Sequence, residues 1–116
     1  MTGIEQVNER STRVFPISFT DGNGDAVIPN AASYRIDDVG SGAAVRDDTE
    51  LQLTSPATTS ADIVLGPSDT SILDETKAYE TRRITVSWTY GDDSPPAQET
   101  AEYFLNVVNL RGVTTP

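Results

Sequence analysis

Alternation of apolar and polar side chains is the dominant pattern of this sequence, and it is clearest over residues 81–90. Successive side chains of a β-strand point to opposite faces of the sheet, so this alternation predicts a strand that is buried on one face. After a polar loop at residues 91–96, residues 98–109 alternate in the same way and predict the return strand of a long hairpin. The hairpin side chains expected to face the core are Ile84, Val86, Trp88, Tyr90, Ala101, Tyr103, Leu105 and Val107.

Shorter segments with the same period precede the hairpin. In residues 12–20, Phe15, Ile17 and Phe19 share one face, and Pro16 lies on the other. Because proline has no backbone N–H to donate, Pro16 predicts that this strand lies at a sheet edge or is broken there. Further short strands are expected at Val27 and Ile28, at Tyr34 and Ile36, at Leu51 and Leu53, and from Ala61 through Ile63 to Leu65.

Residues 66–73 lack this alternation and begin with Pro67, Ser68 and Asp69, which commonly start helices, so one helical turn is predicted there. About seven or eight short strands, separated by turn residues, predict an all-β fold of the two-sheet sandwich type. The sandwich is expected to occupy residues 12–110. The N-terminal arm, residues 1–11, and the C-terminal tail, residues 111–116, are polar ends that we expect to fray in a free domain.

Composition restricts the chemistry that such a domain can perform. The 116 residues suffice for one domain, and they include no cysteine and no histidine. Thiolate nucleophiles, cysteine-based metal sites and the usual general base near neutral pH are therefore excluded. The 18 acidic and 8 basic residues give a net charge of −10, which disfavours nucleic acid and anionic lipid as partners. We expect a protein that is not an enzyme, has no cofactor, and serves as a structural or binding domain.

One turn has a possible metal-binding pattern. Asp21, Asn23 and Asp25 have the spacing of the first ligands of an EF-hand calcium loop. The glycine position of that loop holds Ala26, and the position of its last carboxylate ligand holds Ala32. Asp, Asn and Gly are also the residues that a tight turn needs, so a plain β-turn is the preferred interpretation and calcium the alternative.

Paired aspartates are a second candidate for chemistry, because two carboxylates can act as acid and base on a glycosidic bond. Neighbouring side chains of a strand point to opposite faces, so no single pair provides that geometry, and solvated turns are the preferred interpretation. The pairs are Asp37-Asp38, Asp47-Asp48 and Asp92-Asp93.

Aromatic and basic side chains near the hairpin have two interpretations each. The aromatic residues could form a sugar-stacking platform, but at strand spacing they are expected to be core residues. Arg82 and Arg83 are expected to pair with carboxylates on a neighbouring strand. The aromatic residues concerned are Tyr79, Trp88, Tyr90 and Tyr103.

Two apolar side chains of the return strand have the wrong phase for the core. Phe104 and Val108 alternate with the inward set, so they are expected on the opposite face. There they are either covered by the N-terminal arm or offered to a partner. Together with Leu110 and Val113 near the chain end, they are the candidate partner-binding residues.

The order of these segments resembles the immunoglobulin-like sandwich domains of tailed-bacteriophage virions. In those domains a loop with a short helical turn precedes a long hairpin that ends the domain, and the resemblance covers roughly residues 12–110. The segments that carry it are the strand from Ala61 to Leu65, the turn through Leu73, the strand from Tyr79 to Val86, the turn at Gly91 and the strand from Tyr103 to Leu110.

The resemblance implies a virion structural protein assembled in the bacterial host cytoplasm. A decoration, or cement, protein on the outer surface of a phage head is the leading interpretation, with the major capsid protein or other virion proteins as partners and a homo-oligomer on the particle. A head–tail junction or a tail or baseplate component is the first alternative. A carbohydrate- or host-surface-binding module is the second.

Overall fold

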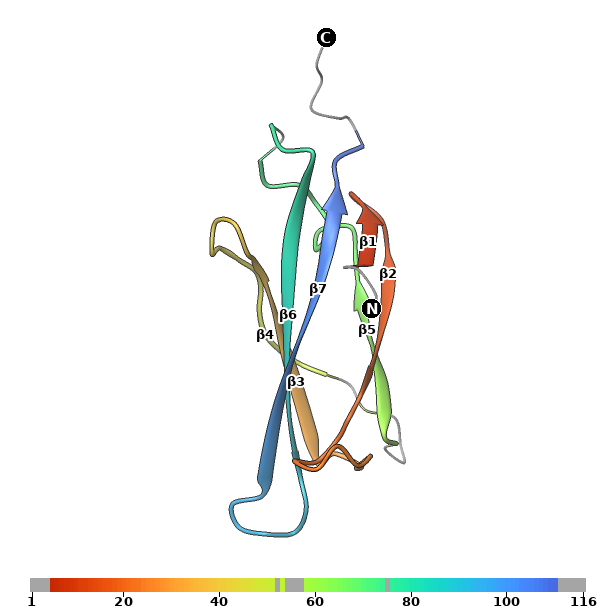
Figure 1. The fold of residues 1–116 in the computed structure, drawn as a ribbon, viewed down its shortest axis with the longest axis vertical. Coiled ribbons are helices and arrows are strands. Elements are labelled where there is room, and N and C mark those ends of the chain that lie inside the picture. Colours follow the sequence, from red (N-terminus) through yellow and green to blue (C-terminus); the bar gives the residue numbers. More distant parts are fainter. Residues whose placement is uncertain (1–4, 52, 54–57, 75, 111–116) are drawn as a thin grey trace.

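The computed structural model describes residues 5–51, 53, 58–74 and 76–110, and this part of the chain forms seven strands in two sheets (Figure 1). The five-stranded sheet has the order β1-β7-β6-β3-β4, and the two-stranded sheet pairs β2 with β5. The all-β, two-sheet prediction is confirmed. The strands are β1 (Glu5–Asn8), β2 (Arg13–Ser18), β3 (Ala31–Asp38), β4 (Ala44–Glu50), β5 (Ser60–Leu65), β6 (Tyr79–Tyr90) and β7 (Ala97–Val108).

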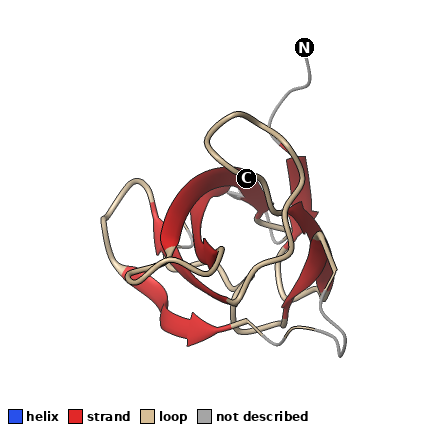
Figure 2. Cartoon of the chain, turned by 90° about the horizontal axis from the view of Figure 1, so that it is seen from below, coloured by secondary structure: helices blue, strands red, loops and turns tan. Residues whose placement is uncertain are grey.

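The predicted hairpin, β6 and β7, forms the centre of the larger sheet. The two strands pair antiparallel through twelve residues each, and β3 pairs antiparallel with the other edge of β6. Figure 2 looks along the long axis and shows the strands arranged around the core. Ile84, Val86, Trp88, Leu105 and Val107 are buried there as predicted, and the other predicted hairpin residues are partly buried.

The two-stranded sheet covers the inner face of the larger one. Phe15, Ile17 and Phe19 are buried, and Pro16 is exposed on a strand that has a single partner among the described residues, so the edge prediction is confirmed. The Phe19 and Trp88 rings meet edge to face with centroids 5.4 Å apart. This contact joins the two sheets, since such pairs add to the stability that burial provides.

The predicted helical turn is wrong. No helix occurs in the described residues, and hence none there is long and apolar enough to cross a membrane. Residues 67–70 form a hydrogen-bonded turn in which the N–H of Asp69 donates to the carbonyl of Gly66 at 2.9 Å. The Asp69 carboxylate in turn accepts the Gly66 N–H at 2.8 Å. The Ser71 hydroxyl donates to the Pro67 carbonyl at 2.9 Å, which is the carbonyl that the Ser71 N–H would bond in an α-helix. A side chain that bonds the backbone locally in this way competes with helix continuation.

Two predicted strands are also misplaced. Val27 and Ile28 form no strand, because the chain there makes only an isolated bridge between Thr20 and Ala26. Leu51 and Leu53 lie just beyond β4, whose own side chains are mostly exposed. β4 is an edge strand with shifts of register, so it has no buried face to impose alternation.

Part of the N-terminal arm belongs to the larger sheet. β1 pairs parallel with the end of β7, from Glu5 opposite Leu105 to Asn8 opposite Val108. Residues 5–8 therefore extend the sheet at its edge. The sequence does not predict this strand, because Val7 is its single buried apolar residue and its neighbours Gln6 and Asn8 are polar.

Candidate interaction surface

The outer face of the five-stranded sheet carries apolar side chains at the end where β6 begins and β7 finishes. Val108 lies opposite Tyr79, and Phe104 lies opposite Arg83. Tyr79 is 54% exposed and Phe104 40%, while Val108 is half-buried beside Tyr79. We call Tyr79, Phe104 and Val108 the outer-face patch. Exposed apolar side chains that gather on one face are a feature of surfaces that bind partners, whereas single ones are common on any protein.

The polar side chains inside this patch satisfy each other. Thr81 and Asn106 lie between the two apolar positions, and the Thr81 hydroxyl donates to the Asn106 Oδ1 at 2.7 Å. A partner that covers the patch therefore need not compete for these two atoms. Desolvating such a satisfied pair costs less than desolvating unpaired groups.

The structure places the other candidate partner-binding residues as follows. Leu110 is 62% exposed just beyond β7, and Val113 lies outside the described residues. β1 lies beside β7 in the same sheet, so the described part of the N-terminal arm does not cover Phe104 or Val108.

A charged ladder continues the same face away from the patch. The Arg35 guanidinium contacts the Asp37 carboxylate at 2.9 Å, and that of Arg83 contacts it at 3.4 Å. The hydrogen bond to Asp37, followed by the charge of that carboxylate, raises the pKa of Arg35. The predicted pairing of Arg83 is confirmed. Asp37 is buried, so its interpretation as a solvated turn residue is wrong.

A buried ion cluster lies on the inner side of the same strands. The Arg82 guanidinium contacts Asp38 at 2.7 Å and Glu80 at 3.0 Å, and all three side chains are buried. It also donates to the Ser71 carbonyl at 2.6 Å. The predicted pairing of Arg82 is confirmed, whereas Asp38, like Asp37, is not a solvated turn residue.

Glu80 connects this cluster to the loop between β5 and β6. Its carboxylate accepts the backbone N–H groups of Leu73 at 2.8 Å and of Asp74 at 2.7 Å. With Arg82 held on the Ser71 carbonyl, residues 71–74 are fastened to β6. The cluster therefore fixes the loop that borders the outer-face patch at Tyr79, because charge-assisted bonds of this kind are the strong ones.

Asp38 fixes the turn between β3 and β4 in a similar way. Its carboxylate accepts the backbone N–H of Ser41 at 2.9 Å and the Ser41 hydroxyl at 2.7 Å. Burial acts to raise the pKa of Asp38, but the Ser41 hydrogen bonds and the charges of Arg82 and Lys77 outweigh it, so this pKa lies below its ordinary value of 3.8.

This lowered pKa predicts a loss of stability in acid. A group whose pKa is lower in the folded state stabilises the fold fully above its unfolded pKa, and this contribution disappears as the pH falls through the folded pKa. We expect the free energy of unfolding of the wild type to fall below about pH 4 more steeply than that of Asp38→Asn. Urea unfolding between about pH 2.5 and about pH 5.5, which spans about one and a half pH units on either side of that value, measures both slopes. Equal slopes would show that Asp38 is not the source.

A hollow of about 250 Å³ lies above the ion cluster, beside the patch. Its lining includes Asp38, Glu80, Lys77, Val39 and Tyr79. The two carboxylates are matched by the positive charges of Lys77 and the adjoining Arg82, so the hollow has no excess charge to attract an ion. Its apolar wall formed by Val39 and Tyr79 instead continues the outer-face patch.

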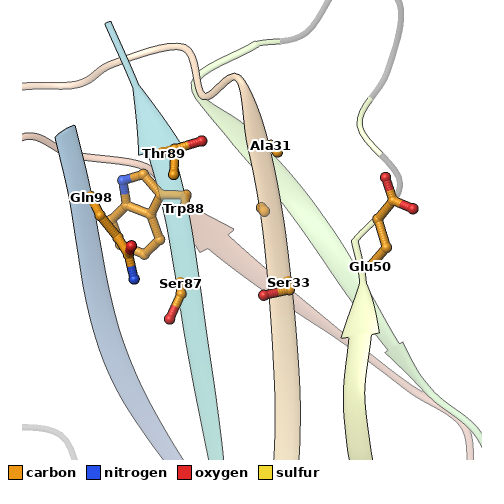
Figure 3. A pocket seen from close by; sticks show the side chains of 8 residues that line it. Ala31, Ser33, Glu50, Ser87, Trp88, Thr89 and Gln98 are labelled. Carbon is orange, nitrogen blue, oxygen red and sulfur yellow. The ribbon is translucent and has the colours of Figure 1, made fainter. Parts of the chain in front are cut away.

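A second, shallow depression of about 340 Å³ lies on the larger sheet and is lined chiefly by short side chains (Figure 3). Ala31, Ser33, Ser87 and Thr89 form much of it. Glu50 is the one carboxylate among its described lining residues, so it holds no acid–base pair.

The aromatic residues are divided between the core and the surface. Trp88 is a core residue as predicted, and its indole N–H donates to the Thr20 carbonyl at 2.9 Å. Tyr90 and Tyr103 are partly buried against the core. Tyr79 is exposed, so the core prediction is wrong for this residue. Tyr79 has the same phase as Thr81 and Arg83, and this is the signal that could have placed it on the outer face.

The Asp21 segment forms the predicted turn. The Asp21 Oδ1 accepts the backbone N–H groups of Asn23 at 2.8 Å and of Asp25 at 3.0 Å. These bonds use one of the two Asp21 carboxylate oxygens to close the turn, as expected for a plain β-turn. Within the described ranges, no group of three or more Asp, Glu, His or Cys side chains could hold a metal ion.

In the described part of the chain, no pair of neighbouring aspartates forms a joint acid–base site. Asp37 pairs with Arg83 on the outer side and Asp38 with buried Arg82, so the two carboxylates serve opposite faces. Asp47 and Asp48 are exposed on edge strand β4. Asp92 and Asp93 are exposed in the loop between β6 and β7.

Comparisons with known proteins give no relative. No family model, curated protein or solved structure matches the chain. Function therefore has to be argued from the surface just described.

Proposed function

We propose that the sandwich is immunoglobulin-like. Immunoglobulin sandwiches place strands B and E in one sheet and strands C, F and G in the other, which variable-type domains extend by C′. The order found here is compatible with that scheme if β2 and β5 are B and E, and if β3, β4, β6 and β7 are C, C′, F and G. The antiparallel pairs β3–β6 and β6–β7 are consistent with neighbouring C, F and G.

We propose further that the domain is a virion structural protein, a decoration protein bound to the outside of a phage head. The outer-face patch is the observation that carries this proposal. It presents Tyr79, Phe104 and Val108 on a sheet whose bordering loop is fastened by Arg82 and Glu80, so binding would require little ordering of the domain. On a shell, many copies with modest individual contacts hold through avidity.

The alternatives use the same domain differently. A head–tail junction or tail component would use the patch as a contact between subunits of a closed ring. Such a ring has cyclic symmetry, whereas a decoration protein follows the lattice of the shell. A carbohydrate-binding module would need an exposed aromatic platform or a calcium site. Tyr79 and Phe104 are exposed aromatic rings, but Trp88 is buried, and the described residues hold no group of three or more Asp, Glu, His or Cys side chains for a metal ion. Calcium-dependent binding is therefore not favoured.

The test is cosedimentation with undecorated head shells assembled from a phage major capsid protein. We expect the wild type to sediment with the shells. The double variant Phe104→Asp, Tyr79→Asp should bind at least roughly 30-fold more weakly, because the loss of a central aromatic contact has an effect of this size. Gln98→Glu is the matched control, since it adds charge to the same face of β7 away from the patch.

The control variant should bind as the wild type does, and urea unfolding should show all variants folded. Wild-type protein that stays in the supernatant at every concentration would refute the decoration role. Equal weakening by Gln98→Glu would show that general charge, and not the outer-face patch, governs binding.

A further inference from the structure

β1 and the residue after it are docked on β7 as one small unit. Of the β1 side chains described, Val7 alone enters the core, while Gln6 and Asn8 are exposed. Beyond the strand, the N–H of Glu9 donates to the Val108 carbonyl at 2.9 Å, and the Glu9 carboxylate accepts the Leu110 N–H at 2.7 Å. This unit is therefore held to the rest of the domain by the pairing of one strand edge, by one buried valine and by the hydrogen bonds of the buried Glu9.

A strained hinge follows this unit directly. Arg10 has φ of 59°, and among the described non-glycine residues it is the one with positive φ. A side chain in this left-handed region clashes with its own backbone, so the conformation persists only where the surroundings impose it. The chain turns here because β1 belongs to the larger sheet and β2 to the smaller one.

Arg10 and Ser11 are both bonded to Thr70 on the far side of the hinge. The N–H of Arg10 donates to the Thr70 carbonyl at 3.1 Å. The N–H of Ser11 donates to the Thr70 hydroxyl at 3.0 Å, and that hydroxyl donates to the Ser11 carbonyl at 2.9 Å. Thr70 is fully buried. Ser11 thus stays with its own domain when β1 leaves, and the pivot lies at Arg10.

We propose that β1 and Glu9 exchange between two copies of this chain. In the exchanged dimer each β1 pairs with the β7 of the other copy and recovers the contacts of β1 and Glu9. Arg10 opens to an extended conformation, which relieves its strain and breaks the hydrogen bond of its N–H to the Thr70 carbonyl. Short hinges under strain favour such exchange, which needs no new interface.

Exposed apolar side chains near the hinge support a second copy as the occupant. Leu110 adjoins the Glu9 contact, and Val14 and Val64 face each other across β2 and β5, all three well exposed. Exchange brings the two domains together at this end, where these side chains can be covered. The inference concerns the isolated chain and does not depend on binding to a shell.

Cysteine cross-linking tests the exchange, because the chain has no cysteine of its own. Gln6 and Asn106 are direct partners in the β1–β7 register, and the Cα spacing of paired strands suits a disulfide. A copy with Gln6→Cys and a copy with Asn106→Cys are mixed in urea, refolded together at high concentration and oxidised. We expect a covalent dimer joined between positions 6 and 106, about a hundredfold above the level from random collision, since thiols held side by side react at millimolar effective concentration.

Two further samples make the result decisive. Each single variant oxidised alone measures random cross-linking, and the double variant in one chain gives a covalent dimer if exchange occurs and a covalent monomer if it does not. Arg10→Gly removes the strain of the closed form, so we expect it to lower the dimer-to-monomer ratio by about tenfold for each hinge. A mixed sample no different from the single variants, with the double variant entirely monomeric, overturns the proposal.

Discussion

Replacing Arg82 by methionine is expected to lower the free energy of unfolding by about 3–5 kcal/mol, because the change leaves two buried carboxylates without their cation. Arg82 is 1% exposed, and its partners Asp38 and Glu80 are almost as buried. Methionine replaces much of the side-chain volume, so the loss reflects charge and hydrogen bonds more than a cavity. Urea unfolding followed by circular dichroism measures the difference.

Arg83→Met is the matched control for this experiment. Arg83 is the next residue of β6 and also pairs with an aspartate, but its side chain is 40% exposed. Pairs in contact with water contribute little, so we expect a loss below about 1 kcal/mol. Similar losses of unfolding free energy in the two variants would show that the contribution of the Arg82 cluster to stability does not depend on its burial.

A triple variant separates the cost of unpaired charge from the value of the pairs. Arg82→Met combined with Asp38→Asn and Glu80→Gln removes all three charges, and much of the stability lost in Arg82→Met alone should return. Glu80 accepts the Leu73 and Asp74 N–H groups on its two separate oxygens, so Glu80→Gln keeps one of these bonds and loses the other, and the recovery of stability is incomplete.

The Arg82 cluster shows which part of such a site the sequence can predict. Arg82 has the phase of Ile84 and Val86, so alternation alone places it on the inner face. Its partner Asp38 is 44 residues away, and only the β3–β6 register brings the two together. Periodicity reports the face of a strand and leaves the identity of the neighbouring strand open.

The strands that were missed have no buried face. β4 is an exposed edge strand, and β1 places a single apolar side chain in the core, so neither shows the period-two pattern on which strand prediction depends. The helical turn predicted within residues 66–73 is absent for another reason. Asp69 is a good helix-start residue, but its carboxylate bonds backward to Gly66 and closes the turn.

The candidate surface was predictable in part for the same reason as the core. Phase alone put Phe104 and Val108 on the outer face, and their exposure agrees with that placement. Tyr79 was missed because β6 begins two residues earlier than its clearest alternation. The partner of this surface leaves no trace in periodicity, so it has to be found by binding experiments.

Phe19→Ala is expected to destabilise the fold by about 3–5 kcal/mol, whereas Phe104→Ala should cost less than about 1 kcal/mol. Phe19 is fully buried against the Trp88 ring and joins the two sheets, so its removal leaves a cavity and breaks an aromatic pair. Phe104 stands 40% exposed on the outer face, where water already surrounds much of its ring.

The same substitution at these two phenylalanines therefore separates a residue that the fold requires from one that the fold tolerates. Urea unfolding with unchanged m-values gives both differences on one scale. If Phe104→Ala costs as much as Phe19→Ala, the Phe104 ring is part of the packed structure, and the outer-face patch loses its main support as a binding surface. If the cost is small, the free energy of burying the exposed part of this ring remains for a partner, and it is a fraction of the roughly 1.5–3 kcal/mol that a fully buried phenylalanine contributes.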